Sequence, residues 1–184
     1  PKKDQYKNKA YDLAVFVINI GNTKLESDLD VTRLKARYRI PVVASVYDTV
    51  YNGLTSAQKQ ILRNGLYEMT KDVLSTQNRD KMVEGHPTEY INSLMMGAIA
   101  LYGEYTDSTD EKLFSEIIYN YDYNFMPTRR FFMGVDGGSF LGYGYGSFRD
   151  VSYGRSVFAL DNAAEPNPGI LQQEAYWLEP WAKW

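Results

Sequence analysis

Residues 55–74 read TSAQKQILRNGLYEMTKDVL, and this stretch decides the fold class. Thr55 and Gln58 have the spacing of a capping box, in which two side chains satisfy backbone amides of the first helical turn. Apolar residues then recur every three or four positions, as on the buried face of a helix: Leu62, Leu66, Met69 and Val73. The stretch therefore predicts a helix that ends near Leu74.

Similar patterns lie before this helix. Residues 42–51 place four apolar side chains on one helical face, and a Gly-Leu pair at 53–54 ends the run: Val43, Val46, Tyr47 and Val50. Residues 10–20 are apolar enough for a helix or a buried strand. Residues 30–40 are compatible with a helix, which we expect Pro41 to interrupt.

Two further helices are predicted after it. Pro87 suits the first turn of a helix, and Gly103 stands where a C-terminal cap is expected. The apolar residues of the helix predicted between them are Ile91, Leu94, Met95, Ala98, Leu101 and Tyr102. Residues 108–111, STDE, form a second capping box that opens a helix reaching Tyr121. This repeated helix–turn–helix pattern predicts an all-α, antiparallel array of helix pairs.

Composition narrows the class of protein. A chain of 184 residues with 44% hydrophobic and 23% charged residues is long and apolar enough for one globular domain, residues 1–184. The net charge of −3 argues against nucleic acid as a partner, and no apolar run is long enough to span a bilayer. The absence of cysteine excludes disulfides and thiolate chemistry. The 16 tyrosines suit sugar-binding clefts and protein interfaces.

The only histidine, His86, and Glu89 lie three positions apart and would share a face of a helical turn. Such a pair could orient a substrate, contribute to a metal site or simply cap the helix. A metal would need further ligands, and without cysteine or a second histidine these would have to be carboxylates. We therefore assign no metal ligand.

A glycine- and tyrosine-rich segment, residues 134–150, is predicted to be a loop or short hairpin. It lacks the ending of a phosphate-binding P-loop. Its Tyr143 and Tyr145 could serve as acid or base if a neighbouring cation favoured the phenolate, and Arg149, Arg129 and Arg130 are close in sequence. The alternative interpretation is a glycine loop with packed aromatic rings.

Three stretches resemble the heparinase II/III-like polysaccharide lyases, a group that includes alginate lyases and is related to dermatan sulfate epimerase. They are VYDTVYNGLT at 46–55, EGHPTE at 84–89 continuing through GAIALYG at 97–103, and DGGSFLGYGYGSFR at 136–149. Their order and spacing agree with the family, and the resemblance covers residues 42–160. It implies an incomplete (α/α) toroid with a cleft for an acidic polysaccharide, and periplasmic or secreted localisation.

The resemblance also implies a reaction and its residues. The reaction is β-elimination at a uronic acid and requires no cofactor. The resemblance does not decide whether a metal ion supports the fold. Tyr145 matches the general acid/base, with Tyr143 as the reserve choice. His86 would neutralise the uronate carboxylate or share the proton transfer, Glu89 would shape the site, and Arg129, Arg130 and Arg149 would face the acidic substrate.

The chain departs from the family at two points. Gly85 stands where many relatives have an asparagine that binds the carboxylate, and the family's second histidine has no counterpart here. We expect the chain to be a fragment of a longer enzyme whose remainder supplies that histidine. The alternatives are a non-catalytic glycan-binding or interaction module and an (α/α) glycoside hydrolase.

Overall fold

The computed structural model describes residues 2–20, 38–75, 87–125 and 127, and every regular element within these ranges is a helix. The long helices are α1 (Lys2–Asn19), α3 (Ile40–Val50), α4 (Ser56–Ser75), α5 (Pro87–Leu101) and α6 (Thr109–Tyr119). A 3-10 turn, η3 (Tyr51–Gly53), joins α3 to α4, and a π-helical turn, η5 (Asn120–Phe125), follows α6. The all-α class is therefore confirmed for the described part of the chain.

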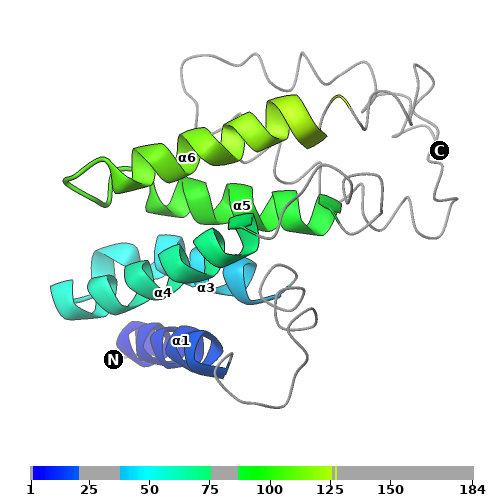
Figure 1. The fold of residues 1–184 in the computed structure, drawn as a ribbon. Coiled ribbons are helices and arrows are strands. Elements are labelled where there is room, and N and C mark those ends of the chain that lie inside the picture. Colours follow the sequence, from blue (N-terminus) through cyan, green and yellow to red (C-terminus); the bar gives the residue numbers. More distant parts are fainter. Residues whose placement is uncertain (1, 21–37, 76–86, 126, 128–184) are drawn as a thin grey trace, which may run out of the picture.

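The helices form a layered stack with α5 near its centre (Figure 1). On one side α5 packs against α6, and on the other against both α3 and α4. Helix α1 packs on α3 and α4 at the edge far from α6. The short turns between α3 and α4 and between α5 and α6 bring each helix back alongside its predecessor, so two helical hairpins lie side by side.

The buried side chains follow the predicted apolar stripes. On α4 all four predicted core residues are buried: Leu62, Leu66, Met69 and Val73. On α5 the buried positions include Ile91, Leu94, Met95, Ala98 and Leu101. Fully burying a Leu, Ile, Val or Met side chain contributes about 1.5–3 kcal/mol, so these stripes stabilise the stack.

Tyr102, named with the apolar residues of this helix, is not part of the core. It is 58% exposed because α5 ends at Leu101 and Tyr102 already lies on the turn. Its ring packs edge-on against Phe114 of α6, with 5.1 Å between the ring centroids. Gly103, the predicted cap, adopts the left-handed conformation (φ 83°) that glycine accommodates without strain.

The described parts of α1 and α3 bear on two further expectations. Residues 10–20 belong to helix α1 up to Asn19 rather than to a strand. Residues 30–37 lie outside the described ranges, so the helix expected there stays a prediction. Pro41 itself stands in the first turn of α3, where its missing N–H needs no helical partner, and does not interrupt that helix. The preceding Arg39 already has helical backbone angles (φ −75°, ψ −53°).

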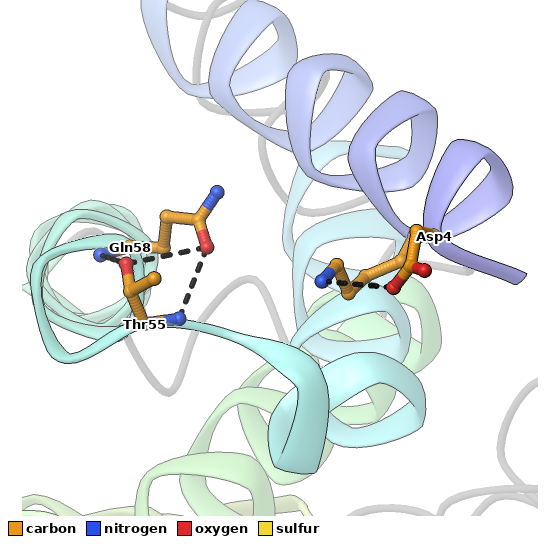
Figure 2. Close-up of polar contacts among 4 residues, drawn as sticks. Asp4, Thr55 and Gln58 are labelled. Carbon is orange, nitrogen blue, oxygen red and sulfur yellow. Dashed lines mark hydrogen bonds and ion pairs between the residues drawn. The ribbon is translucent and has the colours of Figure 1, made fainter. Parts of the chain in front are cut away.

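One of the two predicted capping boxes forms. The Thr55 amide donates to Gln58 Oε1 at 3.0 Å, and the Gln58 amide donates to Thr55 Oγ1 at 3.3 Å (Figure 2). The same view includes the ion pair of Asp4 with Lys7 Nζ at 3.5 Å, one helical turn apart on α1. The second box does not form, because Ser108 has left-handed angles and its side chain caps nothing.

Helix α5 approaches its neighbours closely at Gly97. A methyl group added there would collide with Thr70 Oγ1 on α4 and would lie 3.3 Å from Ile40 Cγ2 on α3. Thr70 is buried, and its hydroxyl donates to the Leu66 carbonyl at 2.7 Å, so it has little room to move away. The absence of a side chain at Gly97 therefore sets the spacing of the three helices.

Candidate functional site

Most residues of the predicted site lie outside the described ranges. This applies to His86, Tyr143, Tyr145, Arg129, Arg130 and Arg149, and to the whole segment 134–150. Glu89 belongs to the first turn of α5, which begins at Pro87 as predicted. Whether these residues form one site therefore stays a prediction.

The described residues contain a polar cluster where α3, α4 and the turn between α5 and α6 meet. We call Tyr47, Arg63, Glu104 and Asp110 the corner cluster. The Tyr47 hydroxyl donates to Glu104 Oε2 at 2.5 Å, across 57 positions of sequence. Arg63 Nη1 donates to the Glu104 backbone carbonyl at 2.7 Å. Glu104 thus connects α3 with α4.

Asp110 holds the same turn from the side of α6. Its Oδ2 atom accepts hydrogen bonds from the Gly103 amide at 2.5 Å and the Glu104 amide at 3.1 Å. The side chain is almost completely buried, with 2% of the residue exposed. Its other oxygen, Oδ1, and Arg63 Nε have no hydrogen-bond partner among the described residues.

The local sequence explains why these residues meet. Tyr47 follows Val43 by one helical turn on the buried face of α3, which aims its hydroxyl across the hairpin towards α5. Gly103 ends α5 with a left-handed turn, and this turn exposes the amides of Gly103 and Glu104. Asp110 stands on the apolar face of α6, three positions before Leu113, and faces those amides.

Burial raises the pKa of two tyrosines in this region, Tyr47 and Tyr105. Burial raises the pKa of Tyr47 far above its ordinary value, and its hydrogen bond to Glu104 raises it further. Burial also raises the pKa of Tyr105, against the opposing effect of the Arg63 guanidinium. Both phenols therefore remain protonated, and Tyr47 acts as a hydrogen-bond donor and not as a base.

The corner cluster is suited to holding a turn rather than to acid–base catalysis. Its tyrosine is protonated, and Asp110 accepts from two backbone amides. The described ranges contain no group of three His, Cys, Asp or Glu side chains that could hold a metal ion. Nor does any helix in those ranges have the length and apolar character needed to cross a membrane.

Arg63, Glu104 and the role of Asp110 were not predicted from the sequence. Asp110 had a readable signal, since an acidic residue in register with Leu113 and Ile117 is a carboxylate on a core-facing stripe. Such a residue requires donors, and the nearest unpaired amides follow the predicted helix end at Gly103. Arg63 and Glu104 stand in ordinary surface patterns and carry no comparable signal.

Comparison with known proteins identifies no relative. No protein-family model matches the sequence, and no curated protein or solved structure is significantly similar to it.

Proposed function

We propose that the chain belongs to a polysaccharide lyase that cleaves an acidic, uronate-containing glycan by β-elimination. The observation that carries this proposal is the ordered set of three lyase-like segments at 46–55, 84–103 and 136–149. The described residues add support, because the first two segments meet. Tyr47 in the first segment donates to Glu104, the residue that follows the second.

The helix pairing also fits the proposed architecture. The hairpins α3/α4 and α5/α6 lie side by side, as successive units of an incomplete (α/α) toroid would. Glu89 lies in the first turn of α5, at the N-terminal end of the central helix of the stack. We propose that the cleft for the acidic polysaccharide lies beside this end of α5. We also propose that the enzyme acts in the periplasm or outside the cell.

The proposed chemistry removes the proton at C5 of a uronate and expels the oxygen at C4. Tyr145 takes the C5 proton, the electron pair forms the C4–C5 double bond, and the glycosidic oxygen leaves with a proton returned by the same residue. His86 neutralises the uronate carboxylate, which stabilises the developing charge. Glu89 shapes the site, Tyr143 is the reserve acid/base, and Arg129, Arg130 and Arg149 hold the acidic chain.

A second candidate is a non-catalytic glycan-binding module. The observation that favours it is the single histidine, since the related lyases use two. An (α/α) glycoside hydrolase is the third candidate and differs in its product. Elimination leaves an unsaturated uronate that absorbs in the near ultraviolet, whereas hydrolysis leaves a saturated sugar.

The deciding experiment is an ultraviolet assay for unsaturated product on heparin, heparan, chondroitin, dermatan, hyaluronan and alginate. It uses the present chain and any longer natural form. We expect an ultraviolet signal on one polymer and its loss in Tyr145→Phe. The matched control is Tyr119→Phe, which changes an exposed side chain of α6. Saturated products would indicate hydrolysis. Binding without any product from the longer form would favour the binding module.

A further inference from the structure

Helix α4 carries a row of cationic and aromatic side chains at intervals of four residues. We call Lys59, Arg63, Tyr67 and Lys71 the α4 ridge. Side chains four positions apart form one continuous ridge on a helix surface. At a rise of 1.5 Å per residue, Lys59 and Lys71 are separated by about 18 Å along the axis. The ridge is thus long enough to follow an extended polymer.

Each cation of the ridge lies over a tyrosine ring. Lys59 Nζ is 3.4 Å from the centroid of the Tyr51 ring, and Arg63 Cζ is 4.6 Å from that of Tyr105. Lys71 Nζ is 5.8 Å from the centroid of Tyr67 on the ridge itself. The rings of Tyr67 and Tyr105 also contact each other, with centroids 5.5 Å apart. The rings and cations therefore form a nearly continuous strip.

These contacts order the cations without neutralising them. A ring attracts an ammonium or guanidinium group through its quadrupole and leaves the positive charge in place. Within the described ranges no carboxylate forms an ion pair with Lys59, Arg63 or Lys71, whereas Lys7 on α1 is paired with Asp4. Long side chains that are already ordered lose less entropy when an anion binds. The strip is therefore prepared for an anionic ligand.

The tyrosines supply the second feature of the strip. Tyr51, Tyr67 and Tyr105 are half-buried, so their rings are held while part of each side chain reaches the surface. The raised pKa of Tyr105 keeps its hydroxyl protonated and able to donate. Fixed aromatic rings with polar tips suit a ligand that combines apolar C–H faces with hydroxyl and carboxylate groups.

We propose that the α4 ridge, together with Tyr51 and Tyr105, binds an extended segment of an acidic polysaccharide. Naming this ligand class rests on the proposed function. Nucleic acid fits less well, because its affinity depends on many phosphate contacts, and this surface offers two lysines and Arg63, whose Nη1 is already bonded to the Glu104 carbonyl, on a chain of net charge −3. The ridge would add its contacts to those of the residues that perform the elimination and so extend the contact between enzyme and substrate.

The test measures binding of alginate and heparin oligosaccharides to the full chain by titration calorimetry at low salt. The variant Lys59→Gln/Lys71→Gln should lower affinity for the preferred polymer about tenfold, with a smaller dependence on salt. The control Lys9→Gln/Lys112→Gln removes two exposed lysines from α1 and α6 and should change affinity less than about twofold. Circular dichroism checks that both variants fold. The single variant Lys71→Gln changes only an exposed side chain, so weaker binding in it cannot result from misfolding.

An acidic neighbour allows a test in the opposite direction. The Glu68 carboxylate is close enough to Tyr105 to contribute to its raised pKa, so it also repels an anion on the ridge. Glu68→Gln should therefore tighten polysaccharide binding about twofold, while Glu111→Gln, at an exposed position of α6, should leave the affinity unchanged. Weaker binding in Glu68→Gln would contradict the proposed position of the ligand.

The outcomes separate this inference from the proposed function. Unsaturated product from wild type together with unaltered binding in the ridge variant would contradict the proposed ridge site and support the lyase. Ridge-dependent binding without any unsaturated product would contradict the lyase proposal and support the proposed ridge site. Absence of binding to every polysaccharide, or equal competition by single-stranded DNA of matched charge, would overturn the ridge as a glycan site.

Discussion

The turn between α3 and α4 and the turn between α5 and α6 carry the same sequence signal but differ in structure. Both are followed by a Ser or Thr with a Gln or Glu three positions later, at 55–58 and at 108–111. At the first turn Thr55 and Gln58 bond each other's amides reciprocally. At the second, Ser108 has left-handed angles (φ 60°, ψ 21°) and its side chain caps nothing.

The difference arises from what lies beneath each turn. The first turn is exposed around Thr55, and local hydrogen bonds determine its geometry. At the second, Asp110 is directed inward to the Gly103 and Glu104 amides, and the segment between must bend to permit this. The exposed Asp107 instead accepts from the Thr109 amide at 3.2 Å, and hydrogen bonding from Thr109 lowers the pKa of that carboxyl. Tertiary contacts thus override a local motif where a buried carboxylate is available.

The largest effect is expected when Asp110 is removed. Asp110→Ala deletes two hydrogen bonds from backbone amides to a charged acceptor and leaves a gap in a buried site. We expect the free energy of unfolding to fall by about 2–3 kcal/mol. Urea denaturation would measure this loss. The neighbouring Glu111→Ala is exposed and should cost less than about 0.5 kcal/mol. Equal losses in the two variants would show that Asp110 does not hold the turn.

The next effect concerns the hydrogen bond that links α3 to the turn between α5 and α6. Tyr47→Phe keeps the buried ring but removes the donor to Glu104 Oε2. We expect a loss of about 1.5 kcal/mol, because a hydrogen bond to a carboxylate disappears and its acceptor stays partly buried. Thermal or urea unfolding measures the loss. Tyr119→Phe, at an exposed position of α6, should leave stability unchanged.

The same residue gives the stability a pH dependence. The pKa of Tyr47 is raised in the folded chain, so the folded state retains the phenolic proton at pH values where the unfolded state releases it. Its stabilising contribution is complete below the ordinary tyrosine pKa of about 10 and declines as the pH rises above it. Wild type should therefore lose stability above pH 10 more steeply than Tyr47→Phe. Parallel curves for the two proteins would contradict the raised pKa.

A smaller effect is expected at the first turn. Thr55→Ala removes the hydroxyl that accepts from the Gln58 amide, which should cost about 1 kcal/mol. Ser56→Ala, one residue further into the same exposed turn, should change stability by less than about 0.5 kcal/mol. Denaturation midpoints of the two variants distinguish a specific cap from a general effect of helix propensity.

The two turns also indicate how far the sequence could be interpreted. Apolar spacing identified the buried faces of α3, α4 and α5, because burial of a stripe depends on helical periodicity alone. The capping box at Thr55 was predictable for the same local reason. The failed box at Ser108 and the corner cluster were not, since both depend on which helix ends meet in space. The predicted lyase residues, Tyr145 and His86 above all, lie outside the described ranges and remain predictions.

The smallest effect should also have the opposite sign. Ser108 holds a left-handed conformation that costs a residue with a Cβ atom roughly 1 kcal/mol, and its side chain supplies no cap in return. Ser108→Gly removes that strain but adds freedom to the unfolded chain, so we expect a net stabilisation of about 0.5 kcal/mol. The equivalent change at the working cap, Thr55→Gly, should be destabilising by a few tenths of a kcal/mol. Chemical denaturation of the two glycine variants therefore tests the contrast directly. A loss of stability in both would mean that Ser108 acts as a cap in solution, and that the two boxes are alike after all.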